Sequence, residues 1–425
     1  MKLCIKNGLV LNPSTNLEQI TDIWVENDKI THIGVTDDVA DKTIDATGKW
    51  VIPGIVDLHV HLREPGFEHK ETIETGCLAA AKGGITTMCC MPNTNPVIDN
   101  ECVVEYINTM ASRANGVNVL PIGAITKGQN GTELASIGKM KEHGICGISE
   151  DGKTVMNSAL MKKAMLYAKE LGLIVFSHAE DMNLIGGAMN AGENAALFGI
   201  KGLGKDAEEI IIARDMILAR YTGCHMHFCH VSSRGGVELI EFGKSLGLPI
   251  TAETAPHYFT LDDSFLFDCD ANKKMNPPLR TKDDVSAILD AIKSGVIDNI
   301  ATDHAPHHYD EKNQPIEQAP FGIVGLETSF ALSYTHLVKS GVLTSLELVN
   351  KMCTKPAQII GIDKGTLEVG KDADITIIDV DKKYMIDSDD FVSKGKNTPF
   401  NGMEVYGEVC YTLTNGNVIY ERENN

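Results

Sequence analysis

Short apolar runs, each about the length of a strand, recur through the middle of the chain and alternate with longer amphipathic stretches. We count eight such runs, at Ile55–Leu62, Ile85–Met91, Val117–Ile125, Ile145–Ser149, Leu173–Ser177, His225–Val231, Ile250–Thr254 and Asn299–Thr302. Runs that are rich in β-branched residues and bounded by turn residues predict buried strands. Their regular recurrence predicts a fold in which strands and helices alternate.

Several of the intervening stretches carry the signals of helices. One begins at Asn157 as an N-cap, continues with apolar residues at helical spacing and stops at Gly172. In another, Thr281 and Asp284 form a capping-box pattern ahead of a helix that ends at Gly295. Eight alternations of this kind predict an α/β fold, a (β/α)₈ TIM-like barrel, with an open doubly wound sheet as the alternative.

The two ends of the chain show a different pattern, in which short β-prone runs are separated by turn residues. Asn7-Gly8 near the start and Asn415-Gly416 near the end are strong turn signals between such runs. Neither end is long enough to bury two faces alone, so we predict that residues 1–52 and 361–425 combine into one small β-sandwich domain. Residues 53–360 would form the barrel, whose closure would bring its two ends together.

Composition and charge narrow the class of protein. A chain of 425 residues exceeds the length of a single core, which favours one large and one small domain. The net charge of −20 argues against nucleic acid or an anionic membrane as a partner. The 11 cysteines include no Cys-x-x-Cys pair, and neither a signal peptide nor a membrane-spanning apolar run is present. These features predict a cytoplasmic protein with reduced thiols.

Polar groups gather where the predicted strands end, which is the face of a barrel that carries function. The first strand ends in His59 and His61, which alternate along the strand and therefore project to the same side. Such a pair can hold a metal ion such as Zn²⁺. A lone histidine at a strand end is more often a structural hydrogen-bonding residue, but polar groups follow seven of the eight strands.

Six of these strand-end groups are suitable metal ligands: His59, His61, Asp151, His178, His230 and Asp303. Four histidines and two aspartates suit two ions better than one. We expect the first histidine pair and Asp303 to hold one ion, the second histidine pair to hold the other, and Asp151 to bridge them. Such a site activates a shared water. Nitrogen and oxygen ligands suit Zn²⁺ best, and Mn²⁺ or Co²⁺ are substitutes.

The motifs that carry these residues resemble those of the amidohydrolase superfamily, and within it the class I dihydroorotases of bacteria. The resemblance runs from end to end, and its most telling blocks are Asp57–Gly66 (DLHVHLREPG), Met91–Pro96 (MPNTNP), Ser177–Asp181, His230–Ser233, Met275–Arg280 (MNPPLR) and Asp303–His307 (DHAPH). It implies a zinc-dependent enzyme that reversibly hydrolyses L-dihydroorotate to N-carbamoyl-L-aspartate in pyrimidine biosynthesis. It also implies two Zn²⁺ per chain, bridged by Asp151 and a hydroxide.

The resemblance further implies roles for individual residues. Asp303 would take the proton of the attacking water and deliver it to the departing amide nitrogen. The substrate-binding positions would be His61, Arg63, Asn93, Asn276, His307, Phe321 and Gly322. Arg63 can fork onto a carboxylate, and the asparagine amides can donate to carboxylate or ring oxygens. The polar segment 307–320 is expected at the rim, either as a closing loop or as an ordinary solvated one.

Two other functions remain open. One is a different cyclic-amide hydrolase, such as a dihydropyrimidinase or an allantoinase, against which Arg63, Asn93 and Asp151 argue. Those relatives use a carboxylated lysine as the bridge, and Lys153 keeps that option open here. The other is a non-catalytic scaffold, which would be expected to lose metal ligands that this chain retains. The family also suggests a homodimer and association with aspartate transcarbamoylase as partners.

Overall fold

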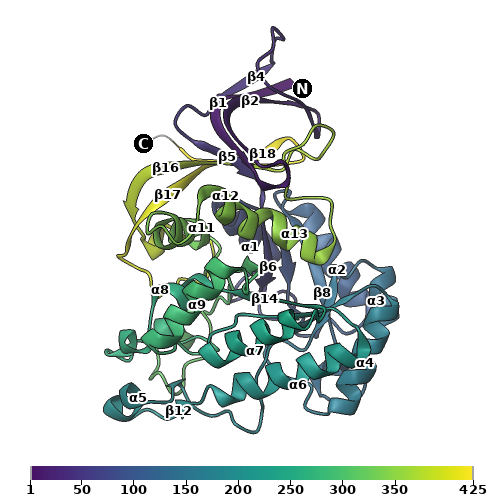
Figure 1. Cartoon of the computed structure of the whole chain (residues 1–425), viewed down its shortest axis with the longest axis vertical. Helices are drawn as coiled ribbons and strands as arrows, with labels where there is room; N and C mark the ends of the chain where they lie inside the picture. Colours follow the sequence, from purple (N-terminus) through teal and green to yellow (C-terminus); the bar gives the residue numbers. More distant parts are fainter. Residues whose placement is uncertain (1, 424–425) are drawn as a thin grey trace.

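The computed structural model describes residues 2–423, and its central feature is a ring of eight parallel strands (Figure 1). These are β6 (Ile55–Val60), β7 (Ile85–Cys90), β8 (Asn118–Ala124), β9 (Gly147–Ser149), β10 (Ile174–Ser177), β13 (Met226–Phe228), β14 (Ile250–Thr254) and β15 (Asn299–Ile300). A parallel bridge between Val60 and His304 closes the ring, and the His61 N–H donates to the His304 carbonyl at 2.8 Å. Each predicted run contains one of these strands, which confirms the barrel.

Helices follow the strands and surround the barrel. The longer ones are α1 (Ile73–Lys82), α2 (Glu101–Arg113), α4 (Ser158–Glu170), α6 (Asp206–Thr222), α7 (Arg234–Ser245) and α9 (Lys282–Ser294), and the six-residue α3 (Ile137–Glu142) lies between β8 and β9. The predicted caps are present. Asn157 accepts hydrogen bonds from the N–H groups of Ala159 and Leu160 at 2.9 and 3.1 Å. The Thr281 N–H donates to the Asp284 carboxylate at 3.0 Å.

Shorter helices and one two-stranded sheet lie in the connections between these elements. They are α5 (Glu193–Phe198), α8 (Pro256–Thr260), α10 (Tyr309–Lys312), α11 (Ser329–Ser333), α12 (Ser345–Val349), α13 (Lys355–Ile360) and the pair β11 (Met189–Asn190) and β12 (Gly202–Leu203). A π-helical turn at Tyr334–Val338 extends α11, and another at Asn350–Thr354 joins α12 to α13. Among residues 2–423, no helix combines the length and the apolar character that crossing a bilayer requires.

Strands from both ends of the chain lie together at the top of Figure 1. They are β1 (Lys2–Asn12), β2 (Leu17–Glu26), β3 (Lys29–Ile33), β4 (Lys42–Asp45), β5 (Trp50–Pro53), β16 (Ile375–Met385), β17 (Glu404–Thr414) and β18 (Asn417–Glu421). All eight belong to one hydrogen-bonded sheet, and the two ends of the chain join where Val51 pairs with Ile377. The predicted union of the termini is confirmed. The boundaries at 52/53 and 360/361 stay predictions.

The terminal sheet is mixed, because β1 runs parallel to β4 and β5 but antiparallel to β2. A single apolar core joins its two parts, with Leu3 and Ile23 from the N-terminal strands packed in the same cluster as Ile375 and Leu413. The N-terminal and C-terminal strands therefore share one core, as expected of a single small domain. Their hydrogen bonds nevertheless join them into one continuous sheet.

The turn predicted at Asn7-Gly8 is wrong. Both residues lie inside β1, where the pairing with β2 shifts between Ile5 and Gly8 and Asn7 has a φ of 62°. An Asn-Gly pair supplies left-handed backbone to a bulge as readily as to a hairpin turn, so the dipeptide alone does not distinguish them. At the other end, Asn415 and Gly416 do form the predicted tight turn between β17 and β18.

Candidate active site

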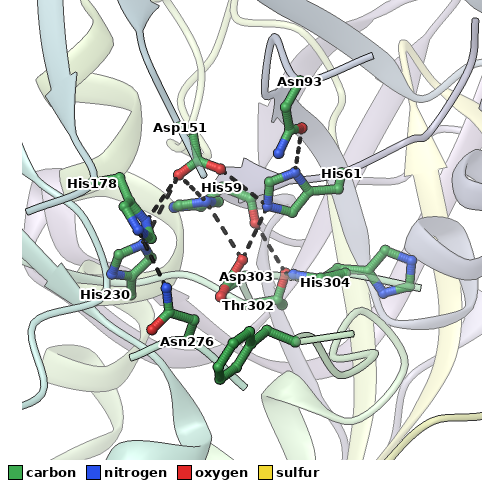
Figure 2. Close-up of polar contacts among 12 residues, drawn as sticks. His59, His61, Asn93, Asp151, His178, His230, Asn276, Thr302, Asp303 and His304 are labelled. Carbon is green, nitrogen blue, oxygen red and sulfur yellow. Dashed lines mark hydrogen bonds and ion pairs between the residues drawn. The ribbon is translucent and has the colours of Figure 1, made fainter. Parts of the chain in front are cut away.

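Four histidine rings and two carboxylates meet at the carboxyl ends of the barrel strands (Figure 2). The structure brings together all six residues that sequence analysis proposed as metal ligands: His59 in β6, His61 just after it, Asp151 after β9, His178 after β10, His230 after β13 and Asp303 after β15. All six are buried. Strands of a closed barrel end at one common face, which explains why residues far apart in sequence converge here.

Asp151 lies at the centre of the cluster. Its Oδ1 is 3.3 Å from His59 Nε2, 3.6 Å from His178 Nδ1 and 3.9 Å from His230 Nε2. Its Oδ2 is 3.4 Å from His61 Nε2. This one carboxylate therefore faces both histidine pairs, which is the placement expected of a bridging ligand.

Asp303 closes the cluster beside the first histidine pair. Its Oδ1 is 3.2 Å from His61 Nε2 and 3.5 Å from His59 Nε2. The backbone of Asp303 has a φ of 49°, and His230 and Arg63 have values of 37° and 63°. Left-handed backbone is uncommon outside glycine and is concentrated at functional sites. Three residues of this site share it.

Buried carboxylates orient two of the rings. His59 Nδ1 lies 2.9 Å from Glu253 and His178 Nε2 lies 3.3 Å from Glu180, so each ring directs its other nitrogen, His59 Nε2 or His178 Nδ1, into the cluster. A cation bound there would replace the ring proton on that nitrogen. His178 Nδ1 is only 2.9 Å from His230 Nε2. Histidines that bind metals are typically oriented in this way by a second partner.

The donor set fits two divalent cations. Two buried atoms at its centre, His59 Nε2 and Asp151 Oδ1, have no hydrogen-bond partner among the described residues. Such atoms are costly to bury unless something binds them. The triads His59–His61–Asp151 and Asp151–His178–His230 each place their ligand atoms within 4.8 Å of one another, and Asp151 belongs to both. Imidazole and carboxylate donors suit Zn²⁺.

The charges of the cluster are strongly coupled. Burial opposes ionisation of the two aspartates, but the histidines outweigh it, holding the pKa of Asp151 well below its usual range and that of Asp303 at about 2. Burial likewise opposes a charge on His59, yet the two aspartates raise its pKa well above the ordinary value. The protein thus stabilises positive charge at this point, as a cation site requires.

A cavity of about 170 Å³ opens beside the cluster. It is lined by five of the predicted substrate-binding residues besides His61, namely Arg63, Asn93, Asn276, Phe321 and Gly322. Arg63 is the only arginine or lysine among the described residues that line it. The Arg63 Nε–H donates to the Pro306 carbonyl at 3.1 Å. Burial lowers the pKa of Arg63 to about 10, so its guanidinium stays charged at neutral pH.

The two asparagines of the cavity present different groups. Asn93 Oδ1 accepts the Nδ1–H of His61 at 2.8 Å, which leaves the Asn93 amide N–H groups as donors. Asn276 was expected to donate as well, but its Nδ2 already donates to the Glu180 carboxylate at 3.1 Å. The buried Asn276 Oδ1 has no partner among residues 2–423. Asn276 therefore offers an acceptor to the cavity, because the carboxylate takes its donors.

His307 lies behind the cavity wall. Its Nε2–H donates to the Phe321 carbonyl at 2.8 Å, and its Nδ1 accepts from Lys70 at 3.3 Å. Burial and the neighbouring cations lower the pKa of His307 far below its ordinary value, so the ring is neutral. A direct contact between His307 and a substrate carboxylate stays a prediction.

The segment 307–320 is anchored. Its short helix α10 ends at Lys312, whose buried Nζ donates to the carbonyls of Lys274, Pro320 and Gly322 at 3.2, 3.0 and 3.0 Å. Three carbonyl partners use all three N–H groups of the ammonium. The segment is therefore fixed behind Phe321 and Gly322, which line the cavity, and none of the residues 307–320 lines it directly.

Lys153 is directed away from the six-residue cluster. Its Nζ donates to the Gln129 carbonyl at 3.0 Å, and the residue is not part of the cavity lining. The position that faces both histidine pairs belongs to Asp151. The geometry thus offers no support for a carboxylated Lys153 as the bridge.

Comparison with known proteins agrees with this geometry. Residues 48–236 match the family model described as Dihydro-orotase-like. The dihydroorotase of Acetivibrio thermocellus is 51% identical over 98% of this chain and 98% of its own length. The dihydroorotase of Ruminiclostridium cellulolyticum is 49% identical over 100% of this chain and 99% of its own.

Solved structures with the same architecture include hydantoinases (dihydropyrimidinases). The L-hydantoinase (dihydropyrimidinase) of Arthrobacter aurescens is 29% identical, with a TM-score of 0.90 over 99% of this chain and 96% of that one. The D-hydantoinase (dihydropyrimidinase) of a Thermus species is 27% identical, with a TM-score of 0.85 over 98% of this chain and 94% of that one. Sequence identity is far higher to the dihydroorotases. The chain belongs to the dihydroorotase family of the amidohydrolases.

Proposed function

We propose that this enzyme catalyses the reversible hydrolysis of L-dihydroorotate to N-carbamoyl-L-aspartate, a step of pyrimidine biosynthesis. One observation carries the proposal: a single cavity joins the six-residue metal cluster to the half-buried Arg63, whose guanidinium is charged. A hydrolase of uncharged cyclic amides has no need of that charge, whereas dihydroorotate carries a carboxylate. The full-length relatives that are named dihydroorotases support the same substrate.

Two Zn²⁺ ions are the proposed cofactors. His59, His61 and Asp303 would hold one ion, His178 and His230 the other, and Asp151 would contact both; the two triads that share Asp151 support this assignment, as does the position of Asp303 beside the first histidine pair. Ions in this position would lower the pKa of a shared water and polarise the amide carbonyl of the substrate.

Asp303 is the proposed acid and base. The histidines hold its pKa at about 2, despite its burial, so its carboxylate is ionised at neutral pH and can accept a proton. As the water oxygen forms a bond to the ring carbonyl carbon, Asp303 takes the water proton. When the carbon–nitrogen bond breaks, Asp303 returns that proton to the departing nitrogen. The same transfers in reverse close the ring.

The cavity lining supports a specific orientation of the substrate. The Arg63 guanidinium would pair with the carboxylate, where planar, charge-assisted hydrogen bonds are strongest. The free amide N–H groups of Asn93 would donate to a carboxylate oxygen. The unpartnered Oδ1 of Asn276 would accept a ring N–H. The backbone at Phe321 and Gly322 lines the remaining wall.

Replacing the proposed base tests the mechanism directly. We expect Asp303→Asn to lower kcat by about a thousandfold or more, because the amide cannot accept the proton, while calorimetry still detects N-carbamoyl-L-aspartate binding. Asp310→Asn is the matched control, since Asp310 is a nearby aspartate whose side chain is 81% exposed. An Asp303→Asn enzyme with more than a tenth of wild-type turnover would refute the assignment.

A dihydropyrimidinase is the second candidate, because the solved structures of the same fold carry that activity in their names. Rates on dihydroorotate, dihydrouracil and allantoin separate the two. We further propose a cytoplasmic enzyme, in keeping with eleven cysteines that are all free. A homodimer or a complex with aspartate transcarbamoylase rests on the family resemblance and is tested by light scattering of the protein alone and of the mixture.

A further inference from the structure

A segment from the far end of the chain reaches the cavity of the barrel. Residues 386–403 connect β16 to β17 of the terminal sheet, and Asn397 within them is 2% exposed. The residues that its side chain contacts lie 75 to 92 positions earlier in the sequence. The buried Asn397 amide therefore links the connection between β16 and β17 to segments of the barrel domain.

The Asn397 side chain uses both of its N–H groups and its oxygen. Its Nδ2 donates to the Ala305 carbonyl at 3.1 Å and to the Gly322 carbonyl at 2.9 Å. Its Oδ1 accepts the His307 N–H at 3.0 Å. Its backbone carbonyl accepts the Val324 N–H at 2.9 Å. One residue thus joins two segments, 305–307 and 322–324.

Each of these two segments contributes one residue to the wall of the cavity. Ala305 and Gly322 line the cavity directly. They approach so closely that a Cβ added to Gly322 would lie 2.8 Å from the Ala305 Cβ, and Gly322 has a φ of 133°. The wall therefore tolerates little displacement of either segment.

Asn397 also acts on Arg63 through Pro306. The Pro306 carbonyl accepts the Arg63 Nε–H at 3.1 Å, and Asn397 bonds to the residues on both sides of that proline. A terminal nitrogen of Arg63 lies 3.3 Å from the His307 ring. The direction of the guanidinium thus depends on a stretch of backbone that Asn397 holds in place.

We propose that Asn397 is a positioning residue for the carboxylate end of the substrate. The terminal sheet, through this residue, becomes part of the substrate site. The inference rests on the proposed function, since it takes Arg63 to bind the substrate carboxylate. Asn397 itself contacts neither the cavity nor the six-residue metal cluster, so its loss should disturb substrate binding far more than metal binding.

The test is Asn397→Asp. This change keeps an acceptor for the His307 N–H but places an oxygen against the Ala305 and Gly322 carbonyls. We expect KM for dihydroorotate to rise about tenfold, the size of one weakened charge-assisted hydrogen bond. The change in kcat should stay within about threefold and the metal content should not change. The preference for dihydroorotate over dihydrouracil, which lacks the carboxylate, should fall by about the same tenfold.

Asn401→Asp is the matched control, because Asn401 lies in the same connection and accepts the Ser388 N–H from an exposed position. It should keep wild-type KM and selectivity. If Asn397→Asp does not fold, Asn397→Ser retains one donor and should show the same shifts at smaller size. Folded variants with wild-type KM and selectivity would overturn the inference. So would a parallel loss of kcat, metal and thermal stability, which indicates a purely structural role.

Arg63→Gln distinguishes this inference from the proposed function. If Arg63→Gln leaves KM and selectivity unchanged, Arg63 does not bind the carboxylate and the proposed function fails with the inference. If Arg63→Gln raises KM and Asn397→Asp does not, the proposed function stands and the role of Asn397 alone is refuted.

Discussion

The two halves of the active site are built in different ways. In the metal half, each ligand projects from the end of a barrel strand, and two of the rings are oriented by the buried carboxylates Glu253 and Glu180. In the substrate half, Arg63 donates to a backbone carbonyl, and the Gly322 carbonyl accepts from Lys312 and from Asn397, which lies 75 residues further along the chain. The metal half is thus set by the barrel itself, whereas the substrate half is set by loops that other regions hold.

This difference predicts that substitutions in one half impair metal binding and substitutions in the other half impair substrate binding. The largest effect should follow Asp151→Asn, which alters the one group shared by both metal triads. We expect kcat/KM to fall about a thousandfold or more and metal content to drop, because the amide supplies one weak donor where two anionic oxygens stood. Activity assays with metal analysis measure both. Retention of two metals per chain with full activity would contradict the bridging role.

A smaller effect should follow Glu253→Gln. Glu253 accepts the Nδ1–H of His59 at 2.9 Å and the Nε2–H of His227 at 3.0 Å. Loss of such a partner typically weakens metal affinity about 10- to 100-fold. At saturating metal, KM for dihydroorotate should equal that of the wild type. An altered KM under those conditions would break the separation between the halves. Metal titration of the apo-protein followed by kinetics measures both quantities.

The metal half could be predicted from sequence, and the substrate half only in part. Strand periodicity and the common face of strand ends were enough to gather His59, His61 and the other four ligands. Glu253 was missed, although a lone carboxylate inside the apolar run Ile250–Thr254 is a detectable signal. Lys312 and Asn397 left no comparable signal, because their partners are backbone carbonyls and carbonyls carry no sequence pattern. Asn276 was expected to donate to the substrate, but its N–H groups donate to Glu180 instead. Glu180 lies 96 residues away, and only the folded chain brings the two side chains together.

The smallest effect on the site should follow a change outside both halves. Burial lowers the pKa of His225 to about 4, and its Nε2 lies 2.8 Å from Thr251 Oγ1. Below about pH 6.5, the ordinary pKa of histidine, His225 binds a proton in the unfolded chain but stays neutral in the folded chain. Stability present above pH 6.5 is therefore lost as the pH falls towards 4, by about 3 kcal/mol for this group.

His225→Asn should remove most of that pH dependence without changing KM or metal content. Denaturant unfolding at pH 7 and at pH 4.5 measures the free energies, and His143→Asn, a histidine near the surface, serves as the control. An unchanged loss of stability on acidification in His225→Asn would show that other groups account for it.

The central claim is that one cavity combines amide-hydrolysing metal chemistry with recognition of a carboxylate by Arg63. The most direct test compares kcat/KM on dihydroorotate, dihydrouracil and allantoin for the metal-loaded wild type and for Arg63→Gln. The wild type should prefer dihydroorotate by at least about a hundredfold, and the variant should lose most of that preference, because a buried charge pair contributes on this scale. Faster wild-type turnover of dihydrouracil or allantoin, or a preference that survives the loss of Arg63, would contradict the claim.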